Sequence, residues 1–154
     1  MLLQATAYDL MYDRASAVTM PPADPARINE MIASIEDNSR QIYILAKEKN
    51  KIAEKISATL DFLRLSKKYL TRDQIDSFTN FSATSQCKAL ALRQTLSELD
   101  TLKPLDTVRR ELLHNNSDLS LVYSELDAML LLQRTALGCL EDVLDSARSL
   151  MRLL

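Results

Sequence analysis

Glycine is nearly absent from this sequence: Gly138 is the only glycine among 154 residues, whereas globular proteins average about 7% glycine. Loops that wrap phosphate groups need glycines, because their backbone adopts conformations that a side chain blocks. Neither a P-loop nor a dinucleotide-binding fingerprint can therefore be found in this chain. Tight turns and bulges depend on glycine as well, so its scarcity favours a fold of a few long α-helices.

Aromatic residues and long apolar runs are also scarce. Aromatic side chains make up 5% of the chain and tryptophan is missing, while 47% of the residues are hydrophobic, an ordinary fraction for a folded protein. No stretch of 18 apolar residues predicts a transmembrane helix, and the N-terminus lacks the basic and apolar regions of a secretory signal. The net charge of −2 gives the whole molecule no strong electrostatic preference.

The two cysteines, Cys87 and Cys139, show no metal-binding spacing. Thiols in a chain without a secretory signal are typical of a reducing compartment. We therefore expect both cysteines to be free and buried, and the protein to be intracellular, either cytoplasmic or nuclear.

The chain divides into an N-terminal segment, 1–23, and a single helical bundle, 24–154. Residues 1–13 have the apolar spacing of a short helix, and consecutive prolines make residues 14–23 a linker. Asp24 is a good N-cap residue and is followed by a proline, which suits the first helical position. The bundle is therefore expected to begin at this point.

The first long helix is expected over residues 25–70. Its heptad positions a and d are mostly apolar, and a helix of residues 28–70 would be about 65 Å long at ~1.5 Å per residue. Because that length exceeds a compact globule of this size, we expect an elongated molecule. Ile42 and Leu45 are expected to be buried and Glu48 exposed. The predicted packing residues of this helix are Ile28, Ile35, Ile42, Leu45, Ile52, Ile56 and Leu63.

The middle segment, 72–114, is expected to be a kinked or broken helix. Thr71 to Gln74 reads as a capping box that opens it. The following residues are rich in serine and threonine, which favours fraying or a break near Asn80. Pro104 should kink or restart the helix. A turn is then expected at 114–117.

The last helix, 117–154, carries the strongest periodic signal. Its a, d and e positions are nearly all apolar, so its stripe is wider than one neighbouring helix would cover. We therefore predict that a second chain packs against it, because a single chain would leave Tyr123 and Leu144 among others in water. The predicted packing residues here are Leu126, Leu130, Leu137, Leu140, Leu144 and Met151.

Three polar residues interrupt the apolar positions. A polar residue in such a place can fix helix register at a cost in stability, or the interface can open to solvent there. We favour the register role for Asn38 and the opening for Lys49, whose aliphatic stem can reach water. The same two interpretations, fixing register or opening to solvent, apply to Gln133.

The segment 40–72 is strongly basic, with nine basic and three acidic residues. One interpretation is a surface for nucleic acid, anionic lipid or an acidic protein. The alternative, which we prefer, is a solvated helix face that also complements the acidic last helix. Few aromatics lie nearby for base stacking, which argues against nucleic acid. The candidate basic surface consists of Lys47, Lys51, Lys55, Lys67 and Lys68.

The sequence shows no recognisable catalytic motif. Glu111 and His114 have the Glu-x-x-His spacing of di-iron helical bundles, but that site needs two such motifs and this chain has one histidine. The single histidine also leaves no convincing Ser-His or Cys-His pair. We therefore expect no catalytic residues, no metal site, no cofactor and no enzymatic activity.

These observations predict an all-α fold, an elongated helical bundle or coiled coil with two long helices and a shorter middle helix. The function that fits best is a structural or interaction subunit whose long helices pack with partner helices, in a homo- or hetero-oligomer. Kinetochore, spindle, tethering and transcription-scaffold complexes contain such subunits. One alternative is a secreted bacterial effector, or its chaperone, that binds a host or cargo protein. Another is a basic-faced module that binds nucleic acid or a membrane surface.

Overall fold

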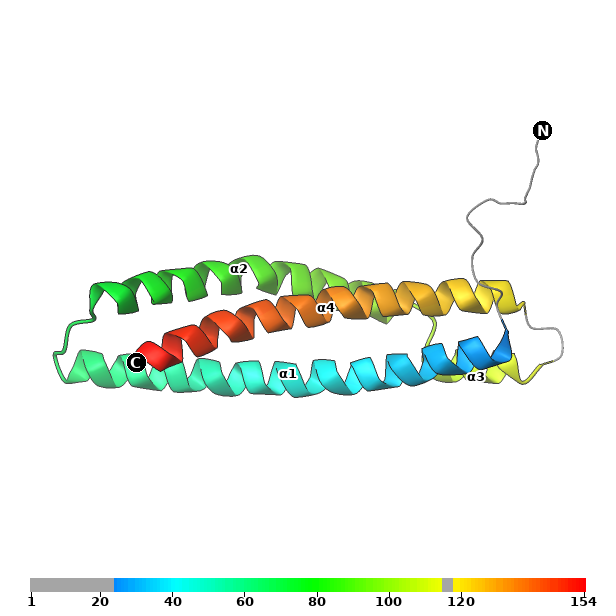
Figure 1. Ribbon diagram of the computed structural model, residues 1–154, viewed down its shortest axis with the longest axis horizontal. Coiled ribbons are helices and arrows are strands. Elements are labelled where there is room, and N and C mark those ends of the chain that lie inside the picture. The colour runs from blue at the N-terminus through cyan, green and yellow to red at the C-terminus, as the bar shows by residue number, and fades with distance from the viewer. Residues whose placement is uncertain (1–23, 115–117) are drawn as a thin grey trace, which may run out of the picture.

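The computed structural model describes residues 24–114 and 118–154. Helices make up 89% of these residues, and no strand occurs among them, so the predicted all-α bundle is confirmed. Figure 1 shows an elongated molecule whose helices run along one long axis. The helix and linker predicted for 1–23 and the turn residues 115–117 lie outside the described residues. The helices are α1 (Pro25–Leu65), α2 (Arg72–Thr101), α3 (Leu105–Leu112) and α4 (Leu119–Leu153).

The starts of the long helices lie where local chemistry predicts them. The Asp24 carboxylate accepts a hydrogen bond from the Arg27 amide at 2.8 Å. The Thr71 hydroxyl accepts from the Gln74 amide at 3.2 Å, and the Gln74 side chain accepts from the Thr71 amide at 2.8 Å. This capping box satisfies amide groups that have no partner within the helix. Asp118 caps α4 in the same way.

α1 ends at Leu65, earlier than the predicted end at residue 70. Lys67 adopts a left-handed conformation with φ of 56°. Its amide donates to the Arg64 carbonyl at 3.1 Å, and the Lys68 amide donates to the Leu63 carbonyl at 3.0 Å. These two bonds form a Schellman motif, which terminates a helix by satisfying its last carbonyl groups. Heptad counting could not find this end, because lysine rarely occupies the position that glycine prefers.

The middle of the chain forms two helices with a bend between them. α2 is continuous through Asn80, so the predicted break there is wrong. Packing against α4 stabilises this segment despite its weak helix propensity. Pro104 separates α2 from α3 and occupies the N-cap position of α3; without an amide hydrogen, it cannot continue α2.

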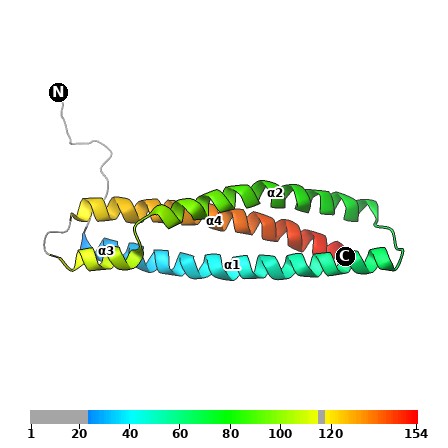
Figure 2. The same ribbon diagram turned by 180° about the vertical axis from the view of Figure 1, so that it is seen from behind.

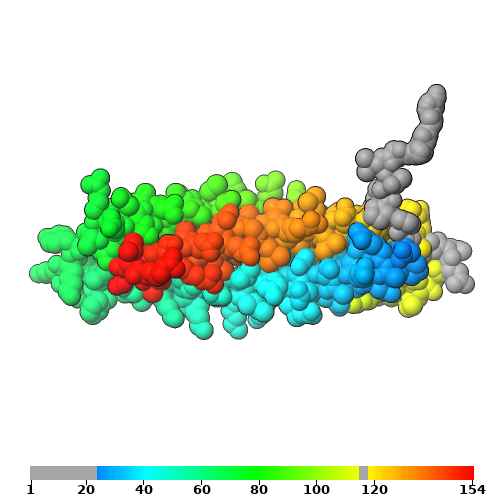
Figure 3. Space-filling model, in the orientation of Figure 1, coloured from blue at the N-terminus to red at the C-terminus, as the bar shows by residue number. Residues whose placement is uncertain are grey.

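α4 is the central helix of the bundle. Both α1 and α2 pack against it, and thirteen of its residues are buried. Figure 2 shows α1 and α2 diverging on either side of α4 towards their connection. On the opposite face, α4 lies along the front of the molecule between α1 and α2 (Figure 3).

Apolar clusters of buried residues lie at both ends of the bundle. The larger one joins α1, α3 and α4 through residues that include Ile28, Val108 and Leu126, all fully buried. The smaller one lies at the other end of the bundle, where Ile56 of α1 and Leu150 of α4 meet, with the half-buried Phe81 of α2 packed against them. α3 therefore fills the space beside α1 at one end of the molecule, and α2 reaches the core at the other.

A buried polar contact lies between α1 and α4. The Gln133 side-chain amide donates to the Ile35 carbonyl at 3.1 Å and to the Ser39 hydroxyl at 3.0 Å. Sliding α4 along α1 by one turn would break both bonds and leave a buried amide unpaired, which costs roughly 1–3 kcal/mol. Gln133 is thus a register-fixing residue rather than a point where the interface opens to solvent.

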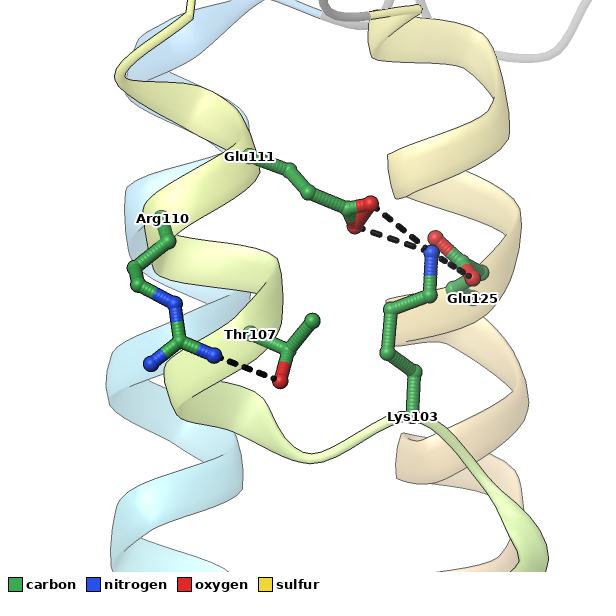
Figure 4. Close-up of polar contacts among 5 residues, drawn as sticks. All are labelled: Lys103, Thr107, Arg110, Glu111 and Glu125. Carbon is green, nitrogen blue, oxygen red and sulfur yellow. Dashed lines mark hydrogen bonds and ion pairs between the residues drawn. The ribbon is translucent and has the colours of Figure 1, made fainter.

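A lysine holds the bend between α2 and α3 against α4. The Lys103 ammonium group donates to both Glu111 carboxylate oxygens at 2.9 Å and pairs with Glu125 of α4 at 3.1 Å (Figure 4). The hydrogen bonds from the two carboxylates raise the pKa of Lys103. The other Glu125 oxygen is buried without a hydrogen-bond partner, so this carboxylate depends on Lys103 for compensation.

Candidate protein-binding groove

A groove runs between α1 and α2. It forms because α4 covers only part of the apolar face of each of these two helices. Near the middle of the bundle it is a hollow of about 350 Å³, bounded by Ala53 on α1, by Phe81 and Ser85 on α2, and by Val143 of α4. Towards the α1–α2 connection it continues as a second hollow of about 470 Å³. Both hollows are lined by Phe78. We call the two together the α1–α2 groove.

The lining of the groove combines exposed apolar side chains with small residues. Phe78 and Ile75 on α2 are 37% and 47% exposed, and Tyr69 in the connection is 97% exposed. Ala53 and Ser85 are short side chains facing the first hollow. Small residues allow another backbone to approach closely. Covering the large apolar residues would stabilise a complex by about 25 cal/mol per Å² of apolar surface buried.

The charged side chains of the groove are all cationic. Lys49, Arg64, Lys68 and Lys88 line it, and no aspartate or glutamate does. Lys88 pairs with Asp142 of α4 at 3.1 Å, and this carboxylate raises the pKa of Lys88.

Two of the four cations have no compensating carboxylate. Arg64 pairs with Asp61 at 3.5 Å, but Lys49 and Lys68 form no ion pair with any described residue. Lys49 is half-buried, and Lys68 is exposed. The expectation that the interface opens to solvent at Lys49 is confirmed, because its side chain lines an open groove.

The predicted basic surface divides between two sides of α1. Residues two apart on a helix point about 200° apart, so Lys51 lies on the face opposite Lys49. Lys47 and Lys55 share the outer face with Lys51, whereas Lys67 and Lys68 lie in the connection after α1. None of these lysines pairs with α4. The prediction that the basic stretch complements α4 is therefore wrong; the ion pair between these helices joins Glu48 of α1 to Arg148 of α4.

The predicted packing residues all contribute to the interior, but to different degrees. Ile42 and Leu45 are half-buried rather than buried. Glu48 is also half-buried rather than exposed, because it pairs with Arg148. The fully or nearly fully buried members are Ile28, Ile35, Ile56, Leu126, Leu140 and Leu144; the half-buried ones are Ile42, Leu45, Ile52, Leu63, Leu130, Leu137 and Met151.

The apolar stripe of α4 is covered within the chain itself. Tyr123 is 6% exposed and Leu144 is fully buried, while Leu137 is half-buried. The expectation that a single chain would leave these residues in water is therefore wrong, because α1, α2 and α3 together cover a stripe that one helix could not. Among the described residues, large apolar side chains that remain exposed occur on all three long helices, including Phe62 of α1, Phe78 of α2 and Leu131 of α4.

Other candidate chemistry has a structural explanation. Glu111 binds Lys103, and within residues 24–114 and 118–154 no group of three or more His, Cys, Asp or Glu side chains is placed to hold a metal ion. Both cysteines are free, but Cys87 is exposed, which contradicts its predicted burial. Among the described helices, none combines the length and the hydropathy that a membrane span requires.

Comparisons with protein-family models, curated proteins and solved structures found no match for this chain.

Sequence reasoning found only part of the groove wall on α2. The helical spacing places Ile75 and Phe78 on one apolar stripe, but Phe81 and Ser85 fall within the stretch where a break was expected and were not assigned to that stripe. The signal was present: Ile75, Phe78, Phe81 and Leu92 recur at intervals that place them on one side of a helix.

Proposed function

We propose that this protein is a non-enzymatic interaction subunit that binds a helix of a partner protein in the α1–α2 groove, as part of a multi-protein assembly. The observation that supports this most is the unpartnered apolar lining between two helices that diverge. A helix laid in an apolar groove is a recurring mode of protein recognition, read by residues at positions i, i+3, i+4 and i+7. Thiols that remain free support an intracellular setting.

The chain contains its own example of such packing. At the opposite end of the bundle, α3 inserts Val108 between α1 and α4, where it is fully buried, and Leu105 and Leu112 pack around it. In the groove, α1, α2 and α4 offer similar apolar and small residues without an inserted helix. A partner helix would cover the apolar residues of the groove in the way that α3 covers those of α1 and α4 at the other end.

A selection of displayed helices tests this proposal. A library of 18-residue helices is selected on the intact protein, and the enriched helices are measured against Ala53→Trp, which fills the groove from α1. We expect enrichment of helices with an apolar face and at least about a tenfold loss of affinity for Ala53→Trp, a loss near 1.4 kcal/mol. Fluorescence anisotropy provides the affinities.

A matched substitution controls for an added indole. Ala33 is also an exposed alanine of α1, but it does not line the groove. Ala33→Trp should leave the affinity unchanged. If no helix is enriched, or if the enriched helices bind Ala53→Trp as well as the parent protein, the groove is not a helix-binding site.

A further inference from the structure

We propose that the partner helix is acidic at both ends, with one group of carboxylates that pairs with Lys49 and another that pairs with Lys68. This inference rests on the proposed function and specifies the chemistry of the partner. It follows from the charges that line the groove, from where the two uncompensated lysines lie, and from the poor fit of a second copy of the chain.

The spacing comes from α1 itself. Lys49 lies 16 residues before Leu65, the last residue of α1, and this separation is about 24 Å at ~1.5 Å per residue. Lys68 follows within the connection and lines the far hollow. A helix laid along α1 would therefore meet one uncompensated cation near each end of a segment of about 16–18 residues.

The charge preference follows from the absence of acids in the lining. A partner with basic ends would bring like charges together beside an apolar surface, where water screens them less than in bulk solvent. A partner with acidic ends would gain a counter-ion for Lys49 and Lys68 without displacing an existing pair. Lys88 and Arg64 already have the carboxylates of Asp142 and Asp61, so the preference depends on the other two.

A second copy of the chain is a poor occupant. Pairing the groove with its own copy in a symmetric dimer would place its four cationic side chains opposite four more. A C2 interface is self-complementary, and one rich in a single sign of charge repels itself. The geometry therefore points to a different protein with an acidic helix.

Three matched peptides test the inference. Each has 18 residues and the apolar positions of the best selected helix, but its ends carry glutamate, glutamine or lysine. We expect affinities in the order glutamate, glutamine, lysine, with about a tenfold difference between the extremes at low salt, because complementary charges strengthen association and exclude the wrong partner. The difference should shrink in 0.5 M salt. A fourth peptide with its glutamates at the centre should bind more weakly than the first.

Charge reversal on the protein gives the decisive comparison. Lys49→Glu with Lys68→Glu should reverse the order of the peptides, whereas Lys51→Glu with Lys55→Glu should preserve it. Both double variants change the net charge equally, but Lys51 and Lys55 do not line the groove. Because Lys49 is half-buried, circular dichroism is used to check that the variant carrying Lys49→Glu still folds. Lys68→Glu alone, at an exposed residue of the connection, should remove part of the preference without affecting the core.

The outcomes separate the two proposals. If all three peptides bind equally and Ala53→Trp still blocks them, the acidic partner is wrong and the helix-binding groove stands. An equal effect of the two double variants would also overturn the inference, since the preference would then come from overall charge. If no peptide binds at low salt, both proposals fail.

Discussion

At the scale of single residues, the polar residues that replace apolar ones in the heptad pattern lie in different environments. Gln133 is buried and its side-chain NH2 group donates to two oxygens of α1, although its Oε1 has no partner, whereas Lys49 lines the open groove. Both residues occupy the same kind of heptad position, so the pattern could not distinguish them. The difference arises because an amide buried between two helices can find a carbonyl, while an ammonium group keeps its charge hydrated through a long stem.

The single glycine is a position where the stability of α4 can be increased. Gly138 lies within α4, and no atom would come within 4 Å of an added Cβ. Alanine is favoured over glycine in a helix interior by roughly 1 kcal/mol, so Gly138→Ala should raise the free energy of unfolding by about that amount. Urea denaturation measures the change. As a control, Ala58→Gly at an exposed residue within α1 should lower it similarly; if Gly138→Ala is destabilising, its site is tighter than this structure shows.

At the scale of elements, the bend after α2 depends on an electrostatic contact. Lys103 joins the bend to Glu111 of α3 and Glu125 of α4. The Thr107 hydroxyl accepts from Arg110 within α3 (Figure 4), so Lys103 is the residue of this group that links separate elements. α3 has only two turns and gains little from its own hydrogen bonds, which makes such tertiary contacts necessary.

The contact predicts a specific dependence on pH. Because the pKa of Lys103 is raised in the folded state, its stabilisation is complete below the unfolded lysine pKa of about 10.4 and is lost as the pH rises through the higher folded value. Lys103→Gln should therefore be less stable than the parent protein at pH 8, and the difference should narrow above about pH 10.4. Urea denaturation at both pH values measures it, with Lys51→Gln, at a lysine without an ion pair, as the control. A gap that stays constant with pH would mean that the charge of Lys103 is not what stabilises the bend.

At the scale of the whole molecule, stability is distributed unevenly among the helices. α4 has thirteen buried residues, α1 has five, and α2 has only Thr95. Amide hydrogens exchange through local opening, whose free energy rises with burial and contact density. The groove therefore lies beside the helix that is held least firmly, and a bound partner would stabilise it.

Hydrogen exchange followed by mass spectrometry tests this order. Peptides from residues 75–95 should exchange first and those from 122–147 last, with α1 between them. Adding the glutamate-ended peptide should slow exchange in 75–95 and leave 122–147 nearly unchanged, because α4 is already covered. Equal exchange rates in α2 and α4 would show instead that the bundle opens as one cooperative unit.

The sequence by itself determined the helical class and the points at which helices begin. Asp24 and the Thr71–Gln74 pair act through hydrogen bonds to amides within one turn, and Pro104 acts through its own ring. Such local effects need no knowledge of the rest of the chain. The end of α1 was less accessible, because the motif there uses a lysine in a left-handed conformation.

Only the tertiary structure decided which helix covers which part of each apolar stripe. The periodicity of α4 shows that several neighbours are needed, but it is equally compatible with helices of the same chain and of another. The folded chain covers Tyr123 and Leu144 internally and leaves Phe78 exposed in the groove. An apolar stripe specifies that a surface is to be buried, because the hydrophobic effect is non-directional and does not specify a partner.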